Sequence, residues 1–362
     1  MSKRNLGTLT LIVLAAVIFP IGVRAQERRK IIIDQDCVGP ATSDLQAVLV
    51  LIQSPQVDPL GITVVSGDEW RDEEVAHTLR MLEIIGRTDI PVVPGAVFPL
   101  INSKEETARW EKLFGKIHYQ GAWNWGKPHD PFFVPELPEG NPTTPPAAED
   151  AAHFMIRMVH KYPHQVTIYA GGPLTNLALA CALDPQFSTL THELVFMGGS
   201  LSTSVDDPEF AATPRREFNM RWDPEAAHMV LRAAWPKITC TTVDISVKTR
   251  LTKEMIRQIG QAPTPLAKYL AKYGQEGYMW DELAAAAWLD PSLITRERQL
   301  FVDVEIDHGA EYGNTVTWIP GDNPGLGEQL VHLQMDVNTS RLYAMFIDLM
   351  TRPTPRPAGK GN

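Results

Sequence analysis

The sequence predicts a single large α/β domain with a mostly parallel central sheet flanked by helices. Short β-prone runs alternate with segments of helical spacing, which is the pattern of βαβ units. Polar or acidic residues follow several of these runs, as in parallel sheets that bind ligands beyond the carboxyl ends of their strands. The 362 residues, 44% of them hydrophobic, can bury a large core. Two smaller domains would also fit that length, but no linker or internal repeat divides the chain.

Residues 1–25 have the order of a secretory signal peptide. A basic start precedes an apolar run over residues 9–18, and Ala25 ends a small-residue cleavage site before Gln26. This predicts a periplasmic or secreted protein, with a domain over 26–352 and a loose tail over 353–362. The apolar run is short for a membrane span, so we expect no stable membrane insertion after cleavage. The alternative is an N-terminal anchor that is not cleaved.

Charge and cysteine content exclude some classes of partner and scaffold. The net charge of −10 argues against nucleic acid as a partner, because phosphate-binding surfaces are usually basic. The three cysteines, Cys37, Cys181 and Cys240, are too few for a disulfide scaffold, although an oxidising compartment allows one bridge. Cys37 has no neighbouring Cys/His cluster and therefore does not suggest zinc.

The first predicted strand, over residues 31–33, delivers two carboxylates at its end. These are Asp34 and Asp36, and Asp44 follows in the first turn of a helix over 44–52 for which Ser43 is the expected N-cap. Three acidic groups near one strand end repel one another. A hard divalent cation such as Ca²⁺ would relieve that repulsion through the oxygen ligands it prefers. The alternative is a strand end with solvated acids.

The later elements continue the alternation. We expect strands at 60–65, 90–93, 166–170, 193–197 and 238–243, helices at 73–85, 148–162, from the GPLTN run through 183, 224 onward and 283–288, then two or three strands after 301 and a helix at 340–350. Gly86 is expected to end one of these helices, and Pro224 after Asp223 is a helix start.

Residues 103–147 break the alternation and are expected to form a lid or insertion. They carry several tryptophans and a proline cluster, and long irregular segments of this kind often hold substrate contacts. The alternative is a structural surface excursion whose tryptophans pack inward.

Several short motifs occur in the order of one known family. They are Asp34-x-Asp36 with Asp44, the GPLTN run Gly172–Asn176, the MGG run Met197–Gly199, Glu217–Asn219, Asp223–Ala227 and Trp280-Asp281. On these motifs the chain resembles the inosine-uridine-preferring nucleoside hydrolase family from about residue 30 to residue 350. The resemblance implies a nucleoside hydrolase-like fold with a Rossmann-like core. It also implies Ca²⁺-dependent hydrolysis of the N-glycosidic bond of ribonucleosides, giving free base and ribose.

The resemblance also implies roles for particular residues. Metal ligands would be Asp36, Asp44, Asp281 and the main-chain carbonyl of Gly171, with Asp36 also the base that takes a proton from water. Asp34 would orient these ligands. The substrate would be bound by Met197, Glu217, Phe218 and Asn219.

The chain departs from the family pattern at four places. Ser43 stands where a further carboxylate is expected to bind a ribose hydroxyl, and the loop from Asp36 to Asp44 is longer than usual. Asp68 replaces an asparagine, and Asp206 lies where another ribose-binding asparagine is expected. These changes question the usual affinity for ribose.

The residue before Asp281 is expected to decide the leaving group. Many members have histidine there, whereas Trp280 resembles the purine-specific, inosine-adenosine-guanosine-like branch, in which a purine stacks between two tryptophans. Stacking can favour a protonated, cationic base. Trp110 is the expected second ring, with Trp123 as runner-up. The alternative for Trp280 is a core aromatic at a helix start.

Two other functions are compatible with parts of the sequence. Asp34-x-Asp36 also fits the phosphatases of the haloacid dehalogenase type, although these give no reason for the GPLTN run or for Trp280. A secreted nucleoside- or sugar-binding protein with a degenerate catalytic site is the non-enzymatic alternative. The oligomeric state is open, with a homodimer or a homotetramer both compatible.

Overall fold

The computed structural model describes residues 28–124, 126, 129–202 and 216–355. The predicted signal peptide, Asp206 and most of the predicted tail therefore lie outside the described residues. Among those that are described, no helix is both long and apolar enough to cross a membrane. All three cysteines are free thiols.

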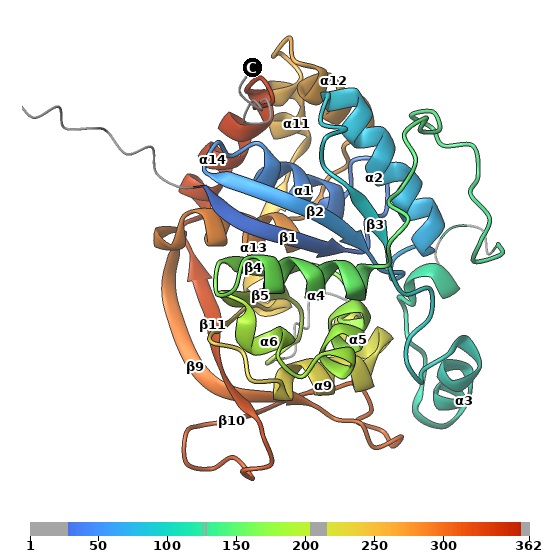
Figure 1. The fold of residues 1–362 in the computed structure, drawn as a ribbon, viewed down its shortest axis with the longest axis vertical. Coiled ribbons are helices and arrows are strands. Elements are labelled where there is room, and N and C mark those ends of the chain that lie inside the picture. Colours follow the sequence, from blue (N-terminus) through green and yellow to red (C-terminus); the bar gives the residue numbers. More distant parts are fainter. Residues whose placement is uncertain (1–27, 125, 127–128, 203–215, 356–362) are drawn as a thin grey trace, which may run out of the picture.

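A nine-stranded sheet with the order β10-β9-β11-β6-β5-β4-β1-β2-β3 forms the centre of the molecule (Figure 1). Its strands are β1 (Arg29–Gln35), β2 (Val57–Val64), β3 (Val92–Pro94), β4 (Val166–Ala170), β5 (Glu193–Met197), β6 (Ile238–Thr241), β9 (Ile294–Val304), β10 (Thr315–Trp318) and β11 (Gln329–Val337). Every neighbouring pair from β3 to β11 is parallel, whereas β9 pairs antiparallel with both β11 and the edge strand β10. The predicted, mostly parallel sheet is confirmed.

The chain changes direction across the sheet next to β1. It passes from β1 to β2 and β3 on one side, and then crosses to β4 on the other side. Asp34 near the end of β1 is in register with Thr63 on β2 and Ala170 on β4. The residues that follow these strands therefore meet at a topological switch point, where open α/β sheets bind ligands.

Helices cover both faces of the sheet. One face carries α1 (Ser43–Ile52), α2 (Arg71–Ile85), α10 (Val243–Ser246), α11 (Lys253–Ile259), α12 (Pro265–Tyr273), α13 (Trp280–Leu289) and α14 (Thr339–Thr351), and the other carries α4 (Ala151–Lys161), α5 (Thr175–Leu183), α6 (Phe187–Leu190) and α9 (Pro224–Arg232). The alternation of side chains along β1 explains the two layers, since Ile31 and Ile33 pack in one core and Ile32 in the other.

Several predicted helix ends are confirmed and one is wrong. Gly86 ends α2 in the left-handed conformation with φ of 72°, and Asp223 caps α9 by accepting a hydrogen bond from Ala226 N. Ser43, however, is the first helical residue of α1 rather than its N-cap. Thr42 holds the N-cap position without a side-chain cap, because its hydroxyl donates to Val38 O and Asp44. The Ser43 hydroxyl is bonded to α13.

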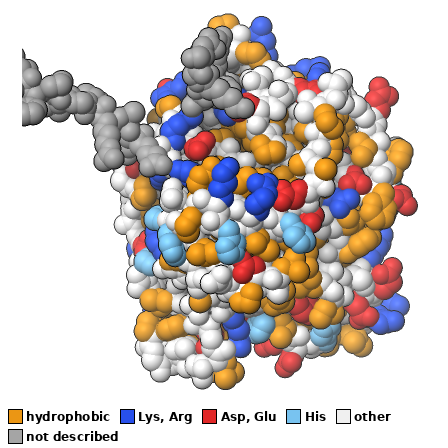
Figure 2. Space-filling model, in the orientation of Figure 1, with side chains coloured by type: hydrophobic (Ala, Val, Ile, Leu, Met, Phe, Trp, Pro, Cys, Tyr) orange, Lys and Arg blue, Asp and Glu red, His pale blue; other side chains and the backbone are white. Residues whose placement is uncertain are grey.

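The expected lid over 103–147 contains α3 (Lys104–Phe114) and the 3-10 turn η1 (Gly121–Trp123). Other short elements are α8 (Phe218–Trp222), η2 (Pro291–Leu293) and a small sheet of β7 (Arg250–Leu251) and β8 (Gly277–Tyr278). In Figure 1, α3 stands away from the central sheet. On the face shown in Figure 2, basic and acidic side chains are interspersed, so this face carries charge of both signs.

Candidate functional site

Asp36 emerges from β1 into a space that only glycines leave open. A Cβ atom built on Gly67 would lie 2.1 Å from Asp36 Oδ2, and one on Gly172 would lie 2.6 Å from Asp36 Oδ1. Asp68 N donates a hydrogen bond of 3.1 Å to Asp36 Oδ2. The glycine of the GPLTN motif and the glycine before Asp68 therefore fix this carboxylate by close backbone contact.

The three predicted carboxylate ligands line one cavity of about 260 Å³. Asp36 comes from the end of β1, Asp44 from the first turn of α1 and Asp281 from the first turn of α13. The cavity is lined by Asp36, Asp44, Asp68, Tyr119, Gly171, Met197, Glu217, Phe218, Asn219, Val243, Trp280 and Asp281. We call it the acidic cavity. It unites residues that are far apart in the sequence, as the sequence predicts.

Neighbouring polar groups hold Asp44 and Asp281 in place. Gln35 Nε2 donates to Asp44 Oδ1 at 2.9 Å. Ser43 Oγ lies 3.1 Å from Asp281 Oδ2 and 2.6 Å from Glu282 Oε2, and it accepts a weak bond of 3.3 Å from Asp281 N. Ser43 therefore links the first turns of α1 and α13. It is not among the described residues that line the acidic cavity.

Burial and mutual repulsion disfavour the ionised forms of these acids. Burial, followed by the charges of Asp68 and Asp44, raises the pKa of Asp36 well above its usual range. Burial likewise raises the pKa of Asp44 to about 6, and burial and the charge of Asp44 raise the pKa of Asp281. The lining described above includes no lysine or arginine to neutralise them.

This donor set fits a hard cation. Asp281 Oδ1 is buried and has no hydrogen-bond partner among the described residues. The carbonyl oxygen of Gly171 accepts one bond of 2.6 Å from Asn219 Nδ2 and keeps a second lone pair. Carboxylate and carbonyl oxygens are the ligands that Ca²⁺ takes.

Another part of the acidic cavity is built around Glu217. Its carboxylate accepts hydrogen bonds from the backbone N–H groups of Gly199, Asn219 and Met220, at 2.9, 2.9 and 3.1 Å, and so caps α8. Asn219 also donates to the carbonyl of Met197 at 3.2 Å. Glu217, Asn219, Met197 and Phe218 thus lie on the cavity, where the sequence expects the substrate.

The aromatic residues at the acidic cavity differ from those expected. Trp280 lines it, as predicted, but the other rings that line it belong to Tyr119 and Phe218, whose centroids lie 5.0 Å apart. Trp123 is buried and stacks on Trp222 at a centroid distance of 4.2 Å. Inward packing, the alternative considered for the lid tryptophans, therefore applies to Trp123.

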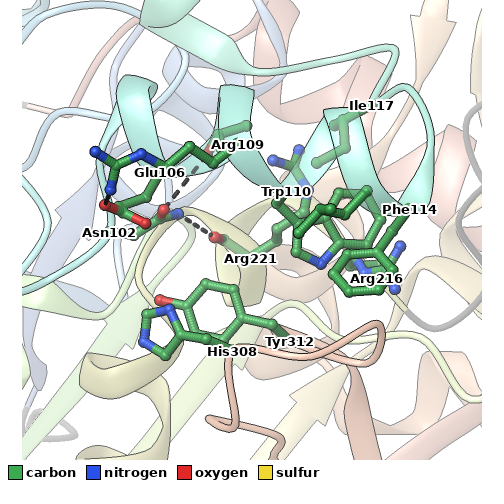
Figure 3. Close-up of a pocket in the computed structure, with 12 residues that line it drawn as sticks. Asn102, Glu106, Arg109, Trp110, Phe114, Ile117, Arg216, Arg221, His308 and Tyr312 are labelled. Carbon is green, nitrogen blue, oxygen red and sulfur yellow. Dashed lines mark hydrogen bonds and ion pairs between the residues drawn. The ribbon is translucent and has the colours of Figure 1, made fainter.

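Trp110 lines a separate cavity of about 210 Å³ (Figure 3). Its Nε1 donates to Gly309 O at 2.8 Å, and the Arg216 guanidinium lies 4.4 Å from its ring centroid. In Figure 3, His308 and Tyr312 lie across this cavity from Trp110. The structure therefore does not bring Trp110 to the acidic cavity, because α3 is directed toward the loop before β10.

Asp34 is fully buried and is not among the residues that line the acidic cavity. Its Oδ1 accepts hydrogen bonds from Thr63 at 2.6 Å and from Asn176 at 2.8 Å, and Asn176 in turn accepts one from Ala96 N at 2.8 Å. Burial raises the pKa of Asp34 to about 7. Its contacts tie β1 to the GPLTN motif, which agrees with the orienting role and not with direct substrate contact.

Comparison with known proteins assigns this arrangement to a family. The sequence model described as inosine-uridine preferring nucleoside hydrolase matches residues 31–344. The chain belongs to that family. Nucleoside hydrolases of this family are metal-dependent, and membership assigns to the chain the hydrolysis of the N-glycosidic bond of ribonucleosides.

Individual relatives agree on the family and differ in their named substrates. The chain is 30% identical over 338 residues to a pyrimidine-specific ribonucleoside hydrolase, RihA, of Shewanella woodyi, covering 90% of this chain and 97% of the relative. It is 31% identical over 282 residues to a probable uridine nucleosidase 2 of Arabidopsis thaliana, covering 74% of this chain and 80% of the relative.

Solved structures of nucleoside hydrolases share the fold. A plant nucleoside hydrolase, PpNRh1, superposes with a TM-score of 0.70 at 25% identity, covering 90% of this chain and 99% of the plant chain. A purine-preferring ribonucleoside hydrolase from Gardnerella vaginalis also gives a TM-score of 0.70, at 21% identity, covering 89% and 98% of the two chains.

The structure adds cavity residues that the nucleoside hydrolase motifs do not contain. Tyr119 reaches the acidic cavity from the lid, and its hydroxyl is hydrogen-bonded to Asp68. Val243, which follows β6, also lines the acidic cavity. Glu282 does not line it but accepts a hydrogen bond of 2.6 Å from the Ser43 hydroxyl. The predicted strand over 238–243 ends at Val243, and the carboxyl ends of strands are where ligands are expected, whereas no local sequence pattern marks Tyr119.

Proposed function

We propose that the chain is a Ca²⁺-dependent ribonucleoside hydrolase that prefers purine nucleosides. The observation that carries the proposal is the meeting of three buried carboxylates, a polar wall and Trp280 on one cavity. Its test is incubation of the purified protein and Ca²⁺ with inosine, adenosine, guanosine, uridine and cytidine, followed by measurement of free base and ribose.

Four groups would hold the cation in this proposal. They are the carboxylates of Asp36, Asp44 and Asp281 and the carbonyl of Gly171, all of which line the acidic cavity. When bound, Ca²⁺ would supply Lewis acidity that lowers the pKa of a coordinated water. It would also offset the repulsion that raises the pKa values of these carboxyl groups.

The side chains of the acidic cavity would handle the proton and the sugar. Asp36 accepts the proton of the attacking water in its ionised form, and its oxygens are held between Gly67 and Gly172 for that purpose. Glu217 and Asn219, which also line the acidic cavity, bind ribose hydroxyls. As the glycosidic bond breaks, the sugar becomes oxocarbenium-like, so the surrounding carboxylates stabilise the charge that develops.

Trp280 would assist the departing base. The lining of the acidic cavity contains no histidine, so no imidazole acid is available there among the described residues. A purine can leave once its imidazole ring is protonated, and an indole face stabilises the cationic form. A pyrimidine offers no such ring nitrogen and leaves less readily.

Replacing Trp280 should slow purine nucleosides selectively. Loss of a base–aromatic contact costs on the order of 1–3 kcal/mol, which is roughly 5- to 150-fold in kcat/KM if the contact is stronger in the transition state. We expect this loss for inosine with Trp280→Ala. The loss should be much smaller for p-nitrophenyl riboside, whose leaving group needs no protonation.

A tryptophan outside the site provides the control for this measurement. Trp318 lies on β10 at the sheet edge, and Trp318→Ala should retain the kcat/KM of the unaltered protein for both substrates. Equal losses on inosine and on p-nitrophenyl riboside in Trp280→Ala would rule out the leaving-group role.

Calcium affinity should increase as pH rises. Asp36 and Asp281 have raised pKa values, and that of Asp44 is about 6, so these carboxyl groups carry protons at acidic pH. A cation must displace those protons below the pKa values but not above them. Each displaced proton weakens binding by roughly tenfold per pH unit below its pKa. Calorimetric titration with Ca²⁺ from about pH 5 to about pH 7.5 measures this, and a constant Kd would contradict the assignment.

A pyrimidine preference is the second candidate. It is favoured by the names of relatives, which include a pyrimidine-specific ribonucleoside hydrolase and a probable uridine nucleosidase. The panel of five nucleosides decides between the two, since faster turnover of uridine than of inosine refutes the purine proposal. Stoichiometric nucleoside binding without release of base would instead support a binding protein with a degenerate site.

A further inference from the structure

A second group of metal-ligating side chains lies outside the acidic cavity. Glu69, Glu73 and His77 each offer one ligand atom, and these atoms lie within 4.8 Å of one another. None of the three lines the acidic cavity. Glu73 and His77 are one turn apart on α2 and so share a face of the helix. We propose that this group binds a divalent transition-metal ion of the Zn²⁺ type.

His77 is oriented as a metal-binding histidine. Its side chain is only 3% exposed, and its Nδ1 is hydrogen-bonded to Glu139, whose side chain is completely buried. A carboxylate can only accept at Nδ1, so the lone pair of the neutral ring lies on Nε2. That Nε2 is directed at Glu69 Oε2, 3.9 Å away, and has no hydrogen bond with a described residue.

The carboxylates of Glu69 and Glu73 lie close to each other and to His77. Glu69 Oε2 is buried and has no hydrogen-bond partner among the described residues. Burial, followed by the charges of Glu73, Asp44 and Glu139, raises the pKa of Glu69 to about 8. His129 Nε2 lies 2.8 Å from Glu73 Oε2 and holds that carboxylate from the lid side. A bound cation would offset the repulsion between these acids.

The donor set selects the class of metal. One imidazole nitrogen with two carboxylates suits Zn²⁺, Co²⁺ or Mn²⁺, whereas Ca²⁺ takes oxygen ligands. The acidic cavity has oxygen donors only, so the two sites would prefer different ions. Both would be occupied together when both metals are present.

The second site would join three parts of the chain. Glu69 and α2 come from the segment after β2, whereas His129 and Glu139 belong to the lid. Arg80 Nε on α2 donates to Glu139 O at 2.9 Å, which already fixes that part of the lid. The loop after β1 touches the same histidine, because a Cβ atom on Gly39 would lie 2.4 Å from the His77 ring. A metal here would therefore anchor the lid beside the loop that carries Asp36 and Asp44.

The test is cobalt binding to untagged protein kept in excess Ca²⁺. We expect one equivalent of Co²⁺ with a visible d–d absorption spectrum, displaced by one equivalent of Zn²⁺. His77→Gln should abolish this binding, and Glu139→Gln, which removes only the orienting carboxylate, should weaken it roughly 10- to 100-fold. His153→Gln, at an exposed histidine on α4, should bind cobalt like the unaltered protein.

Further variants separate the two metal sites and guard against misfolding. Glu73→Gln keeps the size of the side chain and should also lose cobalt, with an unchanged near-ultraviolet circular dichroism spectrum. Asp281→Asn should retain cobalt although it loses Ca²⁺, so that failure of one site does not imply failure of the other. Absence of stoichiometric cobalt in the unaltered protein, or its retention by folded His77→Gln or Glu73→Gln, would overturn the proposal and leave an ordinary histidine–carboxylate network.

Discussion

Asp36→Asn should lower kcat/KM for inosine by on the order of 10²- to 10⁴-fold, the range typical of a lost general acid or base. The amide matches the carboxylate in size but cannot accept a proton from water at neutral pH. The substitution also removes one charge from the acidic cavity, so Ca²⁺ binding should weaken as well. Turnover measured at saturating Ca²⁺ isolates the loss of the base from the loss of the metal.

The matched control for Asp36 is a buried aspartate away from the acidic cavity. Asp303 on β9 is 3% exposed and pairs with Arg232 and His228. Asp303→Asn can reduce stability but should keep the kcat of the folded protein. If Asp36→Asn retained more than about a tenth of the kcat/KM, which is above the range for a lost base, the assignment would be wrong.

Asp281→Asn should abolish stoichiometric Ca²⁺ binding and, with it, Ca²⁺-dependent turnover. The buried Asp281 Oδ1 has no hydrogen-bond partner among the described residues, so a ligand is its remaining source of stabilisation. Metal analysis after dialysis against Ca²⁺ measures the loss directly. The exposed Asp322 provides the control, since Asp322→Asn should retain Ca²⁺ and activity.

The same substitution should change thermal stability in opposite directions with and without metal. The pKa of Asp281 is raised by burial and by Asp44, so at neutral pH its ionised form destabilises the folded state, a cost that disappears below the unfolded-state pKa. Without Ca²⁺, Asp281→Asn should therefore have the higher Tm. At a Ca²⁺ concentration of 100 times Kd, binding stabilises the unaltered protein by about 2.7 kcal/mol, and the order should reverse. A variant that keeps stoichiometric Ca²⁺ contradicts the ligand assignment.

The site residues that lie at or directly after the ends of strands could be predicted from the sequence. Asp36 and Asp44 flank one loop, Gly171 follows β4 and Met197 ends β5, so sheet topology brings them to one edge, although the roles of Gly171 and Met197 were implied by the family resemblance. Asp281 lies on a distant helix, and its place was implied by the family motif and not by periodicity.

The lid could not be predicted in the same way. Trp110 and Trp123 lie in a segment whose direction is set by long-range contacts, such as the bond from Trp110 to Gly309 and the stacking of Trp123 on Trp222. No local pattern encodes those partners. For the same reason, the sequence does not predict that Tyr119 lines the acidic cavity.

Helices α11 and α12 are among those not predicted, although the sequence marks their starts. α11 begins after Thr252, which accepts a hydrogen bond from Met255 N, and α12 begins at Pro265 after the cap Thr264. At α12, a threonine cap followed by proline is a recognisable start signal, whereas α11 has the threonine cap alone. Ser43 shows the opposite case, in which a residue typical of N-caps is taken up by a tertiary contact with Glu282.

The close packing of Asp36 against Gly67 and Gly172 has a consequence for how the site can change. Its side chain gives up its rotational freedom when the chain folds, so little conformational entropy remains to be lost when substrate arrives. The same confinement limits mutational drift, because a glutamate at position 36 would need space that the two glycine backbones occupy. New substrate preferences in this scaffold should therefore arise by exchange of residues such as Trp280 and Tyr119 at the rim, while the carboxylate at the base of the cavity stays the same length.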